Sequence, residues 1–470
     1  MQTDNRDTIV SYIRAHYLPA FAYEDTFSPH FCTKTDGNYL IFEDDRKILD
    51  LTGQLGAITT GNGNQKINDE LINCLKNYGF VWEESFTSYK YDVLRLFFEE
   101  IFKNNPCIKK IRFFNTGSEA VEAAIQLAKE TTGREIILTH TFAYHGWTAK
   151  AQTISDFKAF GKLINPSGGF RLDPEPSIQK YNYPFCQQCP FDKDYLYCKS
   201  RNELYCIAKL REKIKEIGPD HIAAVFTDCA LGLSVIFPPK EFIKQFAKVI
   251  AEFHLTWIDD EIFTGGGRMG QWFAFQQHSE VTPDIICFGK GITNGLIPAS
   301  GIAISQKVTD QMKNLRWELV STFAGNPLAM AVLKGNIEFI LENNLLSEVR
   351  RLGRLIESKI KSLRNEFNCI SSYSGTGFFW GIELVKDRTI SDTPSMASDR
   401  RTVLKKGEKS PLQILRAICL EKGLLIGGYA PNTIRITPPL TLTAQQIEDG
   451  FSMLWDGLKG FEQKIKLGRI

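Results

Sequence analysis

The chain has 470 residues, which is too many for one compact core and enough for two or three domains. Hydrophobic residues make up 43% and charged residues 23%, as in ordinary globular proteins. Lys and Arg number 56 against 54 Asp and Glu. The formal net charge of +2 therefore gives no electrostatic reason to expect nucleic acid or an anionic membrane as a partner.

The sequence carries no recognisable export or membrane signal. Its first residues are polar and include Asp4 and Asp7, where a signal peptide needs a basic start and an apolar core. The longest apolar stretch, 222–237, is short and interrupted by Asp228, so it cannot span a bilayer. We therefore expect a cytoplasmic protein whose eleven cysteines are thiols or metal ligands rather than disulfides.

Local patterns in the first two thirds of the chain predict a mostly parallel sheet. An amphipathic segment at 7–17 precedes two apolar runs, 39–42 and 48–51, whose polar connection indicates a hairpin. Beyond about residue 67, helical periods alternate with apolar runs of strand length, as in a doubly wound α/β sheet covered on both faces. The expected strands are 113–114, 136–138, 223–226, 256–258, 285–288 and 301–304, and two of the expected helices are 118–130 and 239–253.

The pattern changes after about residue 331. The stretch 333–367 predicts one long charged helix, and a polar run at 386–409 predicts a loop. Further expected elements are an apolar run at 378–384, a strand at 433–436 and a helix at 443–458 that begins with a capping box. We divide the chain into an N-terminal segment, 1–75, a large domain, 76–330, with a cysteine-rich insertion, 181–206, and a C-terminal part, 331–470. The two chain ends are expected to form one smaller α+β domain.

Two segments of the large domain end strands with residues suited to ligands. At 113–120 a strand runs into a tight turn, where Gly117 lets the backbone approach a ligand and free N–H groups at Ser118 favour an anion. An ordinary helix cap without a ligand explains this pattern equally well. At 257–262 a strand ends in acids, and a carboxylate there suits a metal or a protonated ring nitrogen.

A third segment ends at Lys290, which closes an apolar run between two glycines. A lysine in such a position is costly unless it is paired or covalently used. Desolvation makes its amine a nucleophile able to form a Schiff base. A surface lysine with a buried stem is the alternative.

Taken together, the order and spacing of these motifs resemble the class III family of pyridoxal-phosphate aminotransferases over nearly the whole chain. The matching segments are 115–120, the aromatic-His-Gly motif at 144–146, the acidic motif and glycines at 260–270, the lysine segment at 284–291, and the later motifs at 322–327 and 434–440.

The resemblance implies pyridoxal 5′-phosphate as the cofactor, on a fold-type I architecture. Lys290 would carry the cofactor as a Schiff base and move the proton between substrate and cofactor. Asp260 would pair with the ring nitrogen and keep it protonated, so that the ring accepts electrons. Tyr144, in the motif with His145, would stack on one ring face, and Ile262 would pack on the other.

The same resemblance implies the remaining contacts and a shared site. Gly117 and Ser118 would hold the phosphate, and Thr322 would reach it from a neighbouring subunit, so a homodimer is implied. Arg435 would bind a substrate carboxylate, a role that suits its planar guanidinium.

Several positions depart from the familiar members of this family. Trp147 stands where members that use 4-aminobutyrate or ornithine have Arg, which makes ω-acid substrates less expected. The Glu-Pro loop is missing, with Asp228 as the nearest substitute for its glutamate, and Phe263 stands where some members have Gln. The glycines at 265–270 follow acids and lack a Rossmann unit, so we reject a nucleotide loop there.

Four cysteines lie within the insertion, at Cys186, Cys189, Cys198 and Cys206. They suit a structural zinc ion or an iron–sulfur cluster, although the second pair is spaced too widely for a standard ribbon. Reduced, part-buried thiols are the alternative.

The sequence thus predicts an enzyme that moves an amino group between an amine or amino acid and a keto or aldehyde acceptor. An aminomutase, racemase or decarboxylase would share the fold and cofactor. A non-catalytic scaffold is the alternative from a different class. The expected partners are small molecules and a second copy of the chain, without nucleic acid or membrane.

Overall fold

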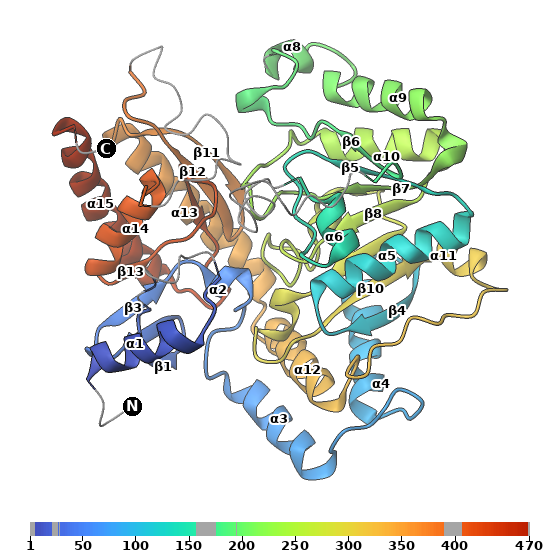
Figure 1. The fold of residues 1–470 in the computed structure, drawn as a ribbon, viewed down its shortest axis with the longest axis horizontal. Helices are drawn as coiled ribbons and strands as arrows, with labels where there is room; N and C mark the ends of the chain where they lie inside the picture. The colour runs from blue at the N-terminus through green and yellow to red at the C-terminus, as the bar shows by residue number, and fades with distance from the viewer. Residues whose placement is uncertain are drawn as a thin grey trace.

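The computed structural model describes residues 5–20, 27, 29–156, 175–193, 195–389 and 407–468. A large sheet with helices on both faces forms one half, and the two ends of the chain lie together in the other half (Figure 1). Among the described helices, none combines the length and apolar character needed to cross a bilayer.

Within the described residues, the large sheet has seven strands in the order β4-β10-β9-β8-β7-β5-β6. Strand β10 runs antiparallel to β4 and β9, and the other neighbours pair in parallel. The six strands predicted from apolar runs are all present, and the mostly parallel α/β sheet is confirmed. The strands are β4 Ile108–Phe114, β5 Ile136–His140, β6 Ile178–Tyr181, β7 Ile222–Thr227, β8 Trp257–Asp260, β9 Ile285–Phe288 and β10 Ser300–Ser305.

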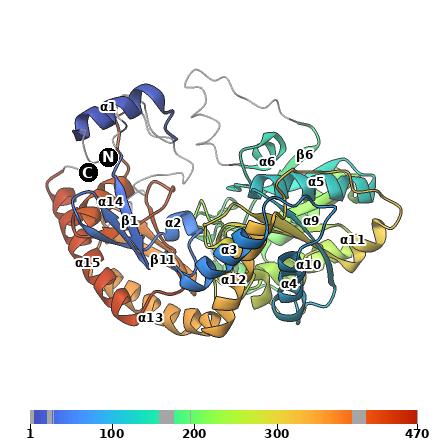
Figure 2. The same ribbon diagram turned by 90° about the horizontal axis from the view of Figure 1, so that it is seen from below.

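Each face of this sheet has its own core, because successive side chains of a strand point to opposite faces. On one face α5 Gly117–Thr132 packs through a row of alanines and apolar residues against side chains such as Phe226 and Ile258. On the other face Val225 and Trp257 pack with α9 Tyr205–Ile217 and α10 Phe242–Glu252. Figure 2 shows α5 and α10 in different layers. Shorter helices beside the sheet are α6 Ala149–Ile154, α8 Tyr195–Lys199, α11 Gln306–Gln311, η3 Cys186–Gln188, η4 Pro219–His221, η5 Ala274–Gln277 and η6 Lys290–Thr293.

The two chain ends share a small sheet. Strand β3 Lys47–Asp50, from the predicted hairpin, pairs in parallel with β13 Leu424–Leu425 from the C-terminal part. A second, three-stranded sheet lies beside it, with α13, α14 and α15 packed against the C-terminal strands. The other helices and strands in this half of the molecule are α1 Arg6–His16, β1 Cys32–Asp36, β2 Tyr39–Phe42, α13 Leu345–Glu366, β11 Ile370–Thr376, β12 Phe379–Leu384, α14 Pro411–Glu421, β14 Thr433–Ile436 and α15 Ala444–Lys466.

The long helix predicted at 333–367 is in fact two helices, α12 Pro327–Glu342 and α13. The chain breaks at Asn344, whose left-handed φ of 48° is compatible with the short polar side chain of asparagine. Helix α12 packs on α3 Gln65–Asn77 and α4 Ser88–Arg95, whereas α13 packs on β11 of the three-stranded sheet. The short α2 Gly53–Gly56 and the π-helix η2 Leu96–Ile101 complete this region. Most of the loop predicted at 386–409 lies outside the described residues.

One buried cation, Arg268, ties the chain ends to the large sheet. Its side chain has no solvent exposure, and its two terminal nitrogens donate hydrogen bonds to four backbone carbonyls. Gly56 and Ile58 supply two acceptors from the N-terminal part, at 3.1 and 3.2 Å. Thr437, at 3.0 Å, and Pro438 supply two from the end of β14.

Replacing this guanidinium should destabilise the protein more than any loss of packing volume explains. Arg268→Met leaves four buried carbonyls without their donors, and we expect a loss of roughly 3 kcal/mol or more in the free energy of unfolding. Arg350→Met is the matched control, because exposed Arg350 donates to one carbonyl, that of Gly270. It should cost about 1 kcal/mol. Thermal unfolding compares the two, and equal falls in the midpoint would contradict this assignment.

Candidate active site

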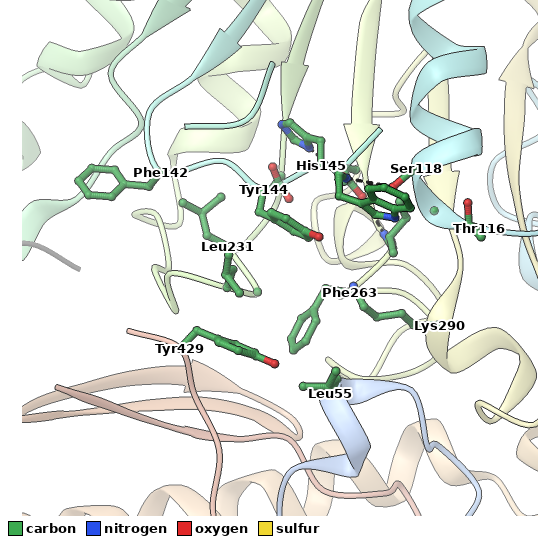
Figure 3. Close-up of a pocket in the computed structure, with 18 of the residues that line it drawn as sticks. Leu55, Thr116, Ser118, Phe142, Tyr144, His145, Leu231, Phe263, Lys290 and Tyr429 are labelled. Carbon is green, nitrogen blue, oxygen red and sulfur yellow. Dashed lines mark hydrogen bonds and ion pairs between the residues drawn. The ribbon is translucent and has the colours of Figure 1, made fainter. Parts of the chain in front are cut away.

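A pocket of about 330 Å³ opens at the carboxyl ends of the central strands, between the large sheet and the chain ends. In Figure 3, Tyr144, Phe263 and Lys290 point toward its centre, and Leu55 and Tyr429 approach from the chain-end side. The position is where open α/β sheets bind ligands. The lining residues are Leu55, Thr116, Gly117, Ser118, Phe142, Tyr144, His145, Gly146, Trp147, Asp228, Leu231, Gly232, Leu233, Asp260, Ile262, Phe263, Lys290, Tyr429 and Arg435.

The start of α5 forms one wall, with Thr116, Gly117 and Ser118 at the pocket. Thr116 caps the helix by accepting a hydrogen bond from the backbone N–H of Glu119. A Cβ on Gly117 would lie 2.8 Å from the Ile262 side chain, so only glycine allows this helix start to approach the acidic strand so closely. The first N–H groups of a helix have no acceptor within the helix, so this helix start favours an anion.

The carboxylate of Asp260 lies at the end of β8 and is held from two sides. Oδ1 accepts from the backbone N–H of Ile262 at 3.0 Å, and Oδ2 lies 2.7 Å from Nδ1 of His145. The other ring nitrogen of His145 is buried and has no hydrogen-bond partner among the residues that the structure describes. The 2.7 Å contact with Nδ1 therefore orients the His145 ring against the Asp260 carboxylate.

Lys290 follows β9 with a left-handed backbone, φ 44°, which is unusual for a lysine. Its amine makes no hydrogen bond to another described residue. The turn after it is fixed by Thr59, whose hydroxyl donates to the Gly291 carbonyl at 2.7 Å, and by Asn336, whose amide donates to the same carbonyl at 3.0 Å.

Four effects set the pKa of this amine. Burial lowers the pKa of Lys290 to about 8, and the nearby cation of Arg435 acts in the same direction. The carboxyl groups of Asp260 and Asp228 oppose that shift. An amine with a pKa of about 8 is half unprotonated at about pH 8, where an ordinary lysine is almost entirely charged.

Arg435 enters the opposite side of the pocket from β14 and is 2% exposed. Its Nη1 donates to the Gly232 carbonyl at 2.7 Å, and its guanidinium stacks 4.7 Å from the Phe263 ring. Burial lowers its pKa to about 10, so it stays a cation at neutral pH. No carboxylate of the described residues forms a salt bridge with it. Asp228 instead pairs with His140, its Oδ2 lying 2.9 Å from Nε2.

The structure brings most of the predicted residues together and leaves two at the edge. Trp147 lines the pocket mouth but is 74% exposed, and Thr322 is exposed and does not line the pocket of its own chain. Next to it, Ser321 accepts a hydrogen bond from the Asn115 side chain at 2.7 Å, which links this loop to the start of α5.

The four insertion cysteines lie near one another but do not form a ligand set. Burial and the neighbouring thiols raise the pKa of Cys186 to about 11 and that of Cys206 to about 12, which shows their proximity. Cys198 is buried, and Cys189 is partly exposed. Among the described residues, no three of these sulfurs lie within 4.8 Å of one another. A metal at this position therefore stays a prediction without structural support.

Comparison with known proteins identifies the architecture. The profile of the family described as Aminotransferase class-III matches residues 20–458. The chain belongs to the class III aminotransferase family. An S-selective transaminase from Arthrobacter sp. superposes with a TM-score of 0.89 at 32% identity, covering 98% of this chain and 99% of that one. The cofactor that the family implies is pyridoxal 5′-phosphate.

Two curated relatives illustrate the range of activities near this chain. A leucine/methionine racemase from Thermococcus litoralis is 26% identical over 93% of this chain and 92% of that protein. A probable 4-aminobutyrate aminotransferase from Bacillus subtilis is also 26% identical, over 91% and 92%. Family and relatives together make the protein an aminotransferase, which moves an amino group between a small-molecule donor and a keto or aldehyde acceptor.

Sequence reasoning missed the residues that complete the wall of this aminotransferase pocket. Leu55, Phe142, Leu231 and Tyr429 line it from four separate segments. No local pattern marks them, because only the fold brings them together. His140 was also missed, although a histidine at the end of a buried strand is a signal that could have singled it out.

The lowered pKa of Lys290 predicts how fast the cofactor attaches to cofactor-free protein. The free amine is the nucleophile, so the rate should rise about tenfold per pH unit below a pKa of about 8 and level off above it. Stopped-flow absorbance with pyridoxal 5′-phosphate measures the rate. Nα-acetyl-lysine is the control and should keep accelerating to about pH 10. A protein rate that rises in parallel with this control would refute the assignment.

Proposed function

We propose that this pocket holds pyridoxal 5′-phosphate on Lys290 and transfers amino groups to and from substrates with an apolar group. The observation that supports the proposal is the convergence of a partly buried lysine, a carboxylate held by a histidine and a helix start on one cavity. When bound, the cofactor supplies an aldehyde that takes the amino group and a ring that accepts the electron pair left by proton removal.

Each role follows from the position of the residue. Asp260, fixed by His145, would keep the ring nitrogen protonated, and the N–H groups at Gly117 and Ser118 would hold the phosphate. Tyr144 and Ile262 would cover the two ring faces. The free Lys290 amine would move the proton between the substrate carbon and the cofactor.

The substrate side of the pocket supports a carboxylate together with an apolar group. Arg435 supplies a buried cation that no carboxylate of the described residues pairs with. The apolar and aromatic walls are Leu55, Leu231, Phe263 and Tyr429. Aliphatic or aromatic α-amino acids and their keto acids fit both parts of this arrangement, and arylalkylamines fit its apolar walls alone. Trp147 offers no cation at the mouth for a distant acidic group.

Direct amino transfer tests the proposal. Protein loaded with pyridoxal 5′-phosphate is mixed with L-leucine, 1-phenylethylamine or 4-aminobutyrate, and the cofactor spectrum and carbonyl product are followed. Leucine and phenylethylamine should convert the cofactor, with 4-aminobutyrate slower. Lys290→Ala should be inactive, and Asp260→Asn should lose about a hundredfold or more in rate. No carbonyl product from any donor would overturn the proposal.

Racemisation is the second candidate, because the Thermococcus litoralis relative is a leucine/methionine racemase. It needs the same lysine and cofactor, but the substrate keeps its amino group and receives a proton on the opposite face of its α-carbon. Incubating L-leucine without a keto acid and measuring D-leucine by chiral chromatography separates the two activities. D-leucine without carbonyl product would favour the racemase.

We further propose that a second copy of the chain completes the site. An aromatic face, made by Phe80, Trp82, Phe86, Val320 and Phe323, is 42–65% exposed. Phe80 and Phe323 contact each other edge to face at 5.7 Å, so its two segments form one surface. Exposed apolar area of this kind indicates a protein interface. Thr322 lies within this face, from which it would reach the partner's phosphate.

A charge on the aromatic face should break both the dimer and cofactor binding. Phe323→Glu should weaken self-association by about a hundredfold and lower cofactor affinity, because Thr322 is then withdrawn from the other site. Leu196→Glu is the matched control, since Leu196 is 74% exposed on α8, outside this face. Sedimentation and cofactor titration measure both effects. A monomeric wild type, or a dimer unaffected by Phe323→Glu, would contradict the interface.

A further inference from the structure

The pocket contains a second carboxyl group, Asp228, whose partner fixes its protonation. Asp228 lies just after β7, and its side chain is 11% exposed in the wall that also contains Leu231 and Gly232. Its Oδ2 lies 2.9 Å from Nε2 of His140, which is the last residue of β5 and is fully buried.

The tautomer of His140 follows from its other contact. Nδ1 lies 3.0 Å from the carbonyl oxygen of Thr141, and a carbonyl oxygen only accepts hydrogen bonds. Nδ1 therefore carries a proton. A 2.9 Å contact between Nε2 and the Asp228 carboxyl then needs one further proton between the two atoms. Whichever atom holds it, the pair has no net charge.

The surroundings place that proton on the aspartate. The His140 ring packs against the rings of Tyr183, Tyr181 and His145, at 4.8, 5.7 and 5.5 Å, and is sealed from water. Burial lowers the pKa of His140 to about 4, despite its backbone hydrogen bond and the opposing charges of Asp156 and Asp260, while Lys180 acts with burial. The neutral ring accepts, and the acid donates.

Burial also raises the pKa of Asp228 well above its usual value. Four charged or titratable groups face it. Asp260 and Glu261 raise its pKa further, and His145 and Lys290 lower it. An ionised Asp228 would stand beside the Asp260 anion and would hold Lys290 in its protonated form, since it acts to raise the pKa of that lysine.

We propose that His140 is a positioning residue that keeps Asp228 as a neutral hydrogen-bond donor, so that the pocket of this enzyme accepts anionic substrates. The inference rests on the proposed function, because it assumes that Arg435 receives the substrate carboxylate. The pocket then selects carboxylates in two ways: Arg435 attracts them, and Asp228 adds no negative charge to that of Asp260.

Binding of an unreactive acid tests the proposal. Calorimetry on the protein loaded with pyridoxal 5′-phosphate compares 3-phenylpropionate with 3-phenylpropanol, which has the same apolar tail without the charge. In His140→Phe, Asp228 loses the acceptor that favours its protonated form, so the pKa of Asp228 falls. The affinity for the acid should fall by about fivefold or more at pH 7.5, and further as pH rises and Asp228 ionises. The affinity for the alcohol should not change.

The second substitution shows whether charge is the cause. Asp228→Asn supplies an N–H that donates to His140 like the protonated acid, so its affinity for 3-phenylpropionate should stay within about twofold of wild type. The double variant, His140→Phe with Asp228→Asn, should recover the affinity lost in His140→Phe.

The outcomes test the carboxylate site at Arg435 and the neutral pair of His140 and Asp228 separately. Arg435→Gln should remove the preference for the acid over the alcohol; if it does not, the proposed carboxylate site fails. If Arg435→Gln behaves as expected but Asp228→Asn tightens acid binding fivefold or more, Asp228 is charged in the wild type and the neutral pair is wrong. Unchanged binding in His140→Phe, or no recovery in the double variant, would also overturn it. If His140→Phe does not fold, Asp228→Asn alone decides.

Discussion

The guanidinium of Arg268 sets the relation between the two halves of the molecule, and the pocket lies between those halves. Its four hydrogen bonds end on backbone carbonyls of both chain ends, so it fixes main chain rather than side chains. Burial lowers its pKa to about 9, which leaves it charged at neutral pH with carbonyl dipoles as its main compensation. Because Gly56 follows Leu55 directly, the same contacts hold a pocket wall in place.

Three ionisable groups in the pocket, Asp260, Lys290 and Arg435, are stabilised by different contacts. Asp260 is held by a backbone N–H and by a histidine ring, which preserves an anion where a protonated ring nitrogen is expected. Lys290 has no hydrogen-bonding partner among the described residues and loses basicity through burial. The Phe263 ring lies 5.4 Å from the Lys290 amine and 4.7 Å from the Arg435 guanidinium. An aromatic face attracts a cation placed over it.

The strands were predictable because both faces of the sheet are covered, which makes each strand a continuous apolar run. Lys290, Asp260 and the start of α5 were predictable because their chemistry is local in sequence. The division between α12 and α13 was not, since Asn344 is compatible with a helix and only the packing of each half on a different layer requires the break. The walls at Phe142 and Tyr429 depend on long-range convergence, which periodicity does not encode.

The pocket draws its two classes of residue from different parts of the chain. The residues assigned to the cofactor follow strands of the large sheet, whereas Leu55 and Tyr429 come from segments near the two ends (Figure 3). Substitutions in the terminal segments can therefore alter which side chain the pocket admits without disturbing the chemistry. Substrate preference can therefore change during evolution at Leu55 and Tyr429 while the residues assigned to the reaction stay the same.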